Sequence, residues 1–204
     1  MDFYTIKQET KNILVGNRLM YLLAVLVVSA ICAVATPILG LGVFISPVLM
    51  GGLYLLGRLL LKEKQFDFYK VFELFKDLNH ALKVIGVYFL TALIVLGGLI
   101  LFFIPGIIFI YRYSQAPFIM VDNPNMGIWD AMKESQKLMH GHKFELILFQ
   151  LSFIGHFLLG IITFGIYLLY VIPYIQISMY NYYLHLTGQN GLSNKNDSNV
   201  LEIY

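Results

Sequence analysis

Charged residues, cysteine and acidic groups inside apolar segments are all scarce in this sequence. Only 13% of its 204 residues are Asp, Glu, Lys or Arg, whereas 58% are hydrophobic. A soluble domain usually carries about 25% charged and about 45–50% apolar residues. This apolar excess is too large for one globular core, so the composition argues against an ordinary soluble domain and indicates a membrane protein.

The chain has a single cysteine, Cys32, which lies in an apolar run. One cysteine cannot form a disulfide within the chain, and no CxxC metal or redox motif is present. We therefore interpret Cys32 as a small hydrophobic residue on a buried or lipid-facing helix. The first 18 residues also lack the early apolar core and the cleavage site of a signal peptide, so we expect the first apolar run to be retained.

Motifs of common catalytic sites are missing as well. The sequence contains no GxSxG, HExxH or GxxxxGK[ST] motif and no pair of acidic residues at membrane level. An intramembrane hydrolase needs such groups, and a proton-coupled carrier usually uses an intramembrane Asp or Glu. His140, His142 and Glu145 match no established zinc spacing. We expect no enzymatic activity, no cofactor, no metal site and no nucleic-acid partner.

Long apolar runs are what the sequence has in abundance. A helix needs about 20 apolar residues to cross about 30 Å of hydrocarbon. Turn-forming proline and glycine residues divide the runs, and the Pro105-Gly106 pair separates two of them. The pattern predicts an all-α, polytopic membrane bundle of six transmembrane helices, near residues 19–36, 46–61, 84–104, 106–121, 144–162 and 166–186. Residues 1–187 then form one integral membrane domain, and the polar residues 188–204 form a disordered cytoplasmic tail.

Two segments between the predicted spans are amphipathic. In residues 62–83, and again from Ile128 to Met139, apolar residues recur at helical spacing while charged residues occupy another face. Such a helix either lies in the membrane interface or packs beneath the bundle. We expect both segments to be helices on the cytoplasmic side.

The positions of the basic residues predict the orientation of the bundle. Lysine and arginine occur in the N-terminal segment, in residues 62–83 and between residues 121 and 144, whereas the three short connections at the opposite ends carry no charge. Because lysine and arginine resist translocation, the charged segments are expected in the cytoplasm. The chain is then three hairpins in the plasma membrane, with both termini cytoplasmic.

Arg112 is the one formal charge that this topology places in the outer half of the bundle. Three arrangements are open for it. Its side chain could reach outer lipid phosphates. It could instead bond to carbonyls freed by the Pro-Gly break, or lie against tyrosine rings. In the third arrangement it holds an anionic ligand in an outward-facing cavity. That arrangement makes Arg112, Gln115 and His156 the candidate ligand-binding residues.

Several strings carry a resemblance to a known family. They are YRYSQAPFIMVDNP at residues 111–124, LSFIG at residues 151–155, Pro173-Tyr174, and the tyrosines at positions 180, 182 and 183. The chain resembles the DUF975 family, uncharacterised multi-pass membrane proteins of low-GC Gram-positive bacteria. That family is similar to the membrane region of some glycerophosphodiester phosphodiesterases, whose catalytic domain has no counterpart here. One departure is His156, where the family pattern has tryptophan. The resemblance implies a bacterial inner-membrane location and no established activity.

Two functions follow as hypotheses. The first is a non-enzymatic membrane protein that binds membrane lipids, other membrane proteins or a second copy of itself, through the bundle and its basic inner face. The alternative is a small transporter or exporter component with an anion-attracting pocket around Arg112.

Overall fold

The computed structural model describes residues 3–37, 40–63, 65–101, 103–163 and 166–189, and within these ranges every regular element is helical. The predicted all-α class is therefore confirmed. Residues 190–204, most of the predicted tail, lie outside the described ranges. In chain order the elements are α1 (Phe3–Leu14), α2 (Arg18–Ala35), α3 (Leu41–Glu63), the 3₁₀-helix η1 (Phe68–Lys76), α4 (Leu78–Leu101), α5 (Phe103–Arg112), α6 (Ala116–Asp122), α7 (Ile128–Leu138), α8 (Lys143–Leu151), α9 (Ile154–Ile162) and α10 (Ile166–Leu186).

Within the described residues, four stretches of helix are long and apolar enough to cross a membrane. They are α2, α3, the first 23 residues of α4, and α8 with α9 taken together. Only 17–22% of the most apolar windows of α2, α4 and α8–α9 are buried inside the protein, against 50% for α3. An exposed apolar surface of this extent is suited to contact with lipid. The structure thus supports a membrane protein, with α3 as its most enclosed helix.

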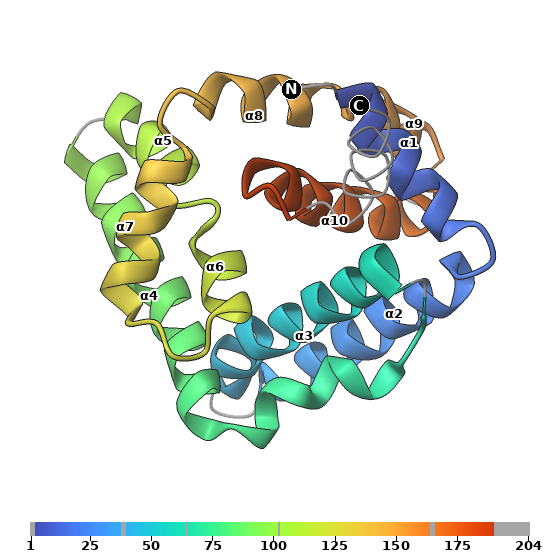
Figure 1. Cartoon of the computed structure of the whole chain (residues 1–204), viewed down its shortest axis with the longest axis horizontal. Helices are drawn as coiled ribbons and strands as arrows, with labels where there is room; N and C mark the ends of the chain where they lie inside the picture. The colour runs from blue at the N-terminus through green and yellow to red at the C-terminus, as the bar shows by residue number, and fades with distance from the viewer. Residues whose placement is uncertain (1–2, 38–39, 64, 102, 164–165, 190–204) are drawn as a thin grey trace, which may run out of the picture.

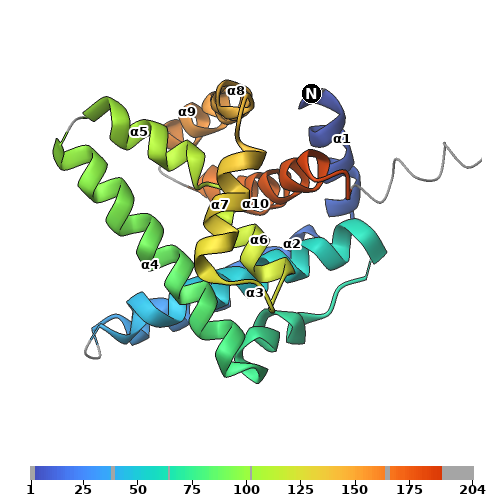
Figure 2. The ribbon, with the colours of Figure 1, turned by 60° about the vertical axis from the view of Figure 1, so that its left-hand side comes forward.

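The predicted fourth span, residues 106–121, is not one helix in the structure. It is divided into α5 and α6, and α5 begins three residues earlier than predicted. Pro105 is accommodated in the first turn of α5, where a backbone N–H has no partner within the helix. Pro117 lies at the start of α6 and cannot continue a helix arriving from α5. The chain therefore runs out along α4 and returns along two short helices (Figure 2).

The predicted fifth span, residues 144–162, is interrupted between α8 and α9 at Ser152 and Phe153. Lys7 donates a hydrogen bond from Nζ to the Ser152 carbonyl, at 3.1 Å, and its ammonium lies 4.3 Å from the centre of the Phe153 ring. A break in a helix frees backbone carbonyls, and here a lysine from the N-terminal helix satisfies one of them. Sequence patterns alone give no sign of this contact.

Residues 62–83, predicted as one amphipathic helix, form three pieces instead. α3 continues to Glu63, η1 occupies the middle, and α4 begins at Leu78. Two aspartates explain the divisions: Asp67 accepts a hydrogen bond from the Tyr69 N–H, and Asp77 accepts from the N–H groups of Asn79 and His80. Aspartate at these positions caps the start of a new helix. The second predicted amphipathic helix is present as α7.

The N-terminal segment, interpreted above only as charged cytoplasmic chain, forms the amphipathic helix α1. Ile6 and Thr10 are fully buried and Ile13 nearly so, at the spacing of one helical face. That face packs mainly on α10, where Asn181 donates from Nδ2 to the Ile6 carbonyl at 3.2 Å and to Glu9 Oε2 at 3.0 Å.

The predicted sixth span corresponds to α10, which has the predicted bounds. It lies in the middle of the molecule, between α1 and α9 on one side and α2 and α3 on the other (Figure 1). It is not among the helices that meet the length and hydropathy of a span. The Arg18 guanidinium also lies 3.8 Å from the Tyr170 ring centre. Arg18 is in a segment predicted to be cytoplasmic, whereas Tyr170 is near the start of α10, which is predicted to lie toward the outer side. The contact therefore joins two positions that the predicted topology places on opposite sides.

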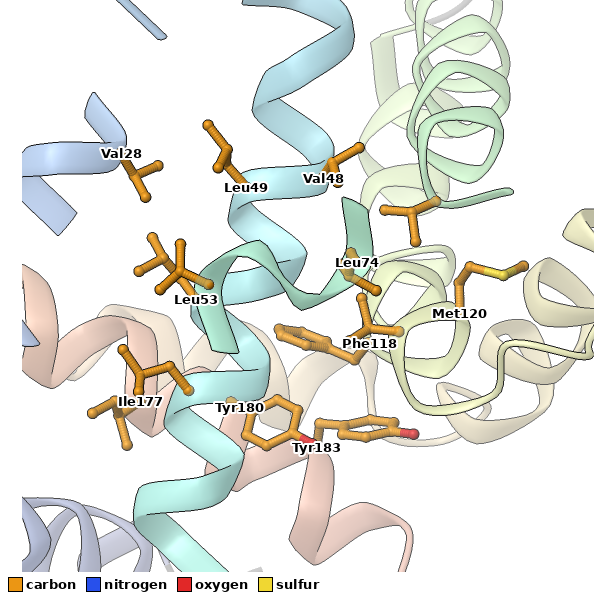
Figure 3. Close-up of a cluster of buried hydrophobic side chains, with 14 of the residues drawn as sticks. Val28, Val48, Leu49, Leu53, Leu74, Phe118, Met120, Ile177, Tyr180 and Tyr183 are labelled. Carbon is orange, nitrogen blue, oxygen red and sulfur yellow. The ribbon is translucent and has the colours of Figure 1, made fainter. Parts of the chain in front are cut away.

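The main core forms where α3, α6 and α10 meet (Figure 3). The rings of Phe118, Tyr180 and Tyr183 pack with centroids 5.5–5.8 Å apart, and Tyr54 joins them from α3 at 4.4 Å from Phe118. Aromatic rings at such distances pack in tilted or offset arrangements that add to the benefit of burial. This cluster holds α6 against α3 and α10, and so positions the last residue of α6, Asp122.

Candidate functional site

A buried ion pair lies beside the aromatic cluster. Arg58, near the end of α3, donates from Nη1 to Asp122 Oδ1 at 2.7 Å, and the Tyr180 hydroxyl donates to the same oxygen at 3.1 Å. The Asp122 side chain is 3% exposed, whereas that of Arg58 is 33% exposed. The carboxylate is thus held inside the protein by two donors, while the guanidinium reaches toward the surface.

The environment of Asp122 changes its titration. Burial raises the pKa of the Asp122 carboxyl above its ordinary value, and this effect outweighs Arg58 and the Tyr180 hydroxyl, which act in the opposite direction. Asp122 lies outside the four candidate spans. Its charge is stable in the folded protein only as long as its donors remain in place.

A cavity of about 570 Å³ opens next to this ion pair. Leucines of α3 and η1, together with Val121, supply apolar side chains to its lining. Four basic side chains line it: Arg58, Lys62, Lys70 and Lys76. Four acidic side chains line it too: Glu63, Glu73, Asp77 and Asp122. A volume between about 300 and 1,000 Å³ is typical of sites for small ligands.

Several of these charges already have partners within the protein. Besides the Arg58–Asp122 pair, Lys70 lies 2.8 Å from Glu73, and the Asp77 carboxylate is occupied with the start of α4. Lys62, Lys76 and Glu63 make no hydrogen bond or ion pair with another residue that the structure describes. These three side chains are available to a ligand.

The far side of the cavity is fixed by bonds between α4 and the end of α6. His80 Nε2, which must carry its proton to donate, bonds to the Met120 carbonyl at 2.8 Å. Lys83 Nζ donates to the Pro124 carbonyl at 2.9 Å. The cavity therefore lies where α3 ends, α4 begins and α6 ends.

The residues proposed from sequence lie elsewhere. Arg112 ends α5, its Nε atom is buried without a hydrogen-bond partner in the described part of the chain, and its guanidinium is 5.9 Å from the Tyr113 ring centre. Gln115 is 2% exposed and donates to Ser114 Oγ at 3.0 Å. His156, on α9, lies 5.9–6.2 Å from the rings of Tyr167 and Tyr174.

None of these three residues lines the cavity, and no described contact joins His156 to the other two. Arg112 is close to a tyrosine ring, as the second of its three arrangements requires. A ligand-binding role for Arg112, Gln115 and His156 stays a prediction.

The sequence patterns assigned no binding role to Arg58, Asp122 or Tyr180. One signal was available: Arg58 is the single charge in the apolar run from residue 19 to 61, and Asp122 directly follows another apolar run. Both positions are at predicted inner ends of spans. A charge at the end of a membrane span is often paired with an opposite charge. Arg58 and Asp122, however, are 64 residues apart in the sequence, and no local pattern identifies one as the partner of the other.

The fold and the cavity together define an all-helical protein with membrane-capable helices and a charged pocket at one end. The sequence model of a family described as "Protein of unknown function (DUF975)" matches residues 79–190, which is more than half of the chain, so this protein belongs to that family. No curated protein matches the sequence significantly. No solved structure does so either.

Proposed function

We propose that this protein is a non-enzymatic, multi-pass protein of the cell membrane that binds lipid headgroups in the cavity between α3, η1 and the end of α6. The observation that carries the proposal is the composition of the cavity, in which leucines line the same space as charged side chains that make no hydrogen bond or ion pair in the described part of the chain. A lipid at a membrane interface presents the same two chemistries, a polar headgroup and an acyl chain.

The proposed arrangement in the membrane is six crossings as three hairpins, with residues 1–187 as one membrane domain and both termini in the cytoplasm. Contacts at one end of the molecule support the first two hairpins. The Arg58–Asp122 pair and the bond from Lys83 to Pro124 bring the end of α3, the start of α4 and the end of α6 to one level. The rule that positive charge stays inside assigns this level to the cytoplasm.

The non-enzymatic part of the proposal rests on the motifs that the sequence lacks. The lining of the cavity supports binding chemistry: lysines for phosphate, carboxylates for ammonium groups, and leucines for acyl chains. Partner proteins or a second copy of the chain are further proposed ligands of the outward apolar helices, as membrane helices associate through such faces.

The test is retention of lipid by the purified protein, measured by native mass spectrometry after extraction in a mild detergent. The double variant Lys62→Gln/Lys76→Gln removes two cavity cations. The matched control Lys133→Gln/Lys137→Gln removes two exposed cations from α7, outside the cavity. We expect the cavity variant to lose at least tenfold of its bound lipid while the control keeps it. Equal losses in both variants, or no retained lipid in the wild type, would overturn the proposal.

A further inference from the structure

The cavity has an unusual balance of charge for a site that faces a membrane surface rich in anionic lipid. Basic and acidic side chains line it in equal number, four of each. A pocket for a purely anionic headgroup would be expected to carry an excess of cations, because each carboxylate facing the ligand opposes its binding. Two of these cations and three of these carboxylates are held by contacts within the protein, and the remaining charges, Lys62, Lys76 and Glu63, still include both signs. A ligand that carries both signs suits this lining.

The side chains left without partners narrow the choice. Lys62 and Lys76 are two cations suited to one phosphate group, and Glu63 is an acceptor suited to one ammonium group. A phosphate alone would add negative charge near the Glu63 carboxylate, whose attraction within the protein is to Lys70, a lysine that is already paired with Glu73. A phosphate joined to an amine would satisfy all three side chains.

The kind of ammonium group can also be inferred. Quaternary ammonium ligands are recognised by aromatic rings, through the attraction of a cation to a ring face. No phenylalanine, tyrosine or tryptophan is among the described residues that line this cavity. A primary ammonium instead donates hydrogen bonds to carboxylates, which the cavity does supply.

The apolar side chains of the lining indicate whether the ligand comes from the membrane or from aqueous solution. Leu55, Leu59 and Leu74 line the cavity together with its charges. Leu55 and Leu59 belong to α3, which is long enough to span the bilayer. A free phosphate ester would gain nothing from these leucines. The first carbons of an acyl chain would bury apolar surface against them.

We propose that the cavity binds the headgroup of a zwitterionic phospholipid that carries one phosphodiester and one primary ammonium, as in phosphatidylethanolamine. Lys62 and Lys76 hold the phosphate, Glu63 holds the ammonium, and the leucines contact the start of the acyl chain. This inference rests on the proposed function, because it assigns a headgroup to the same cavity.

The experiment titrates the purified protein with short-chain phosphatidylethanolamine, phosphatidylcholine and phosphatidylglycerol, and with water-soluble O-phosphoethanolamine, with bound ligand counted by native mass spectrometry. We expect phosphatidylethanolamine to bind at least tenfold more tightly than the other three. Glu63→Gln should remove that preference while phosphatidylglycerol binding stays or improves. Lys62→Gln/Lys76→Gln should weaken both lipids, and the α7 control variant neither.

The outcomes separate this inference from the function on which it rests. Tightest binding of phosphatidylglycerol, unaffected by Glu63→Gln but lost in Lys62→Gln/Lys76→Gln, would overturn the zwitterionic headgroup and leave a lipid-binding cavity. Equal binding of phosphatidylcholine and phosphatidylethanolamine would overturn the role of the primary ammonium. If O-phosphoethanolamine bound as tightly as phosphatidylethanolamine, the acyl chain would contribute nothing, and the inference that the ligand is a membrane lipid would be overturned. Absence of any cavity-dependent lipid binding would remove both proposals.

Discussion

At the scale of single residues, the Arg58–Asp122 pair is asymmetric. The aspartate side chain is almost fully enclosed, whereas the arginine side chain is one-third exposed. Water can therefore compensate Arg58 if its partner is lost, but it has little access to Asp122. A buried charge left without a partner is far more costly than a buried pair that is replaced or neutralised. The two residues should consequently respond very differently to substitution.

Arg58→Met is expected to destabilise the protein by about 1–3 kcal/mol, since it strips a charged acceptor of its main donor. Asp122→Asn keeps the size and an acceptor oxygen for Tyr180, removes the buried charge, and leaves an arginine that can reach solvent. It should cost less than about 1 kcal/mol. Unfolding of each variant in mixed micelles, followed by far-UV circular dichroism, gives the comparison. An Asp122→Asn variant less stable than Arg58→Met would contradict it.

The raised pKa of Asp122 also predicts how stability depends on pH. Because the folded state binds this proton more tightly than the unfolded chain, the stabilising effect of protonation is complete below the ordinary carboxyl pKa of 3.8 and is lost as pH rises through the higher folded value. Arg58, Lys62, Tyr180 and Tyr183 are the groups that act on it. Wild type should therefore gain stability relative to Asp122→Asn as the pH is lowered from neutral. A constant difference between the two proteins across that range would refute this.

The residues of the site show what sequence can and cannot predict. Arg112, Gln115 and His156 were selected because each is polar within an apolar run, which is a local property. The cavity depends on Arg58 meeting Asp122 and on Asp77 ending η1, and these relations become visible only when α3, α6 and α4 are packed together. The basic residues of segment 62–83 were recognised from sequence, but the acidic residues among them were not assigned a role.

At the scale of helices, the apolar runs predicted α2 to within one residue at each end and the end of α4 to within three residues. α4 begins six residues earlier than predicted, where Asp77 caps it. The larger errors come from proline. Pro47, at the start of the predicted span 46–61, lies inside α3, which begins five residues earlier than predicted, and Pro105 lies inside α5. Pro117, which does divide two helices, was expected inside a span. Whether a proline ends a helix depends on which carbonyls are otherwise satisfied, and that is set by neighbouring helices.

The contact between α3 and η1 depends on one glycine. A Cβ atom at Gly52 would overlap the backbone carbonyl of Val71, which cannot move without shifting η1. Gly52→Ala is therefore expected to destabilise the protein by about 1–3 kcal/mol through overpacking. Gly97→Ala is the matched control, because nothing lies within 4 Å of its added Cβ. It should be neutral or stabilising by up to about 1 kcal/mol. Equal thermal stability of the two variants in detergent would show that η1 does not pack closely on α3.

At the scale of the whole molecule, two arrangements differ in how many times the chain crosses the membrane. With four crossings, by α2, α3, α4 and α8–α9, the stretch from α5 to α7 stays on the outer side. With six, α5 and α6 return to the inner side together, and α10 makes the last crossing. Both arrangements place both termini in the cytoplasm, so the ends of the chain cannot distinguish them. They differ in where α7 and the connection after α9 lie.

The bond from Lys83 to Pro124 decides what we expect for α7. It joins the start of α4 to the residues just after α6, so the chain must return to the level from which α4 departs. In a Cys32→Ser background, Lys70→Cys and Lys133→Cys should react with a membrane-impermeant maleimide only after the cells are broken. Ile162→Cys, at the exposed end of α9, should react in intact cells. Labelling of position 133 from outside would leave four crossings and place the lysines of α7 against the rule that positive charge stays inside. If position 162 reacted only from inside, α8–α9 and α10 would not cross as a hairpin, and the Arg18–Tyr170 contact would lie at the inner face.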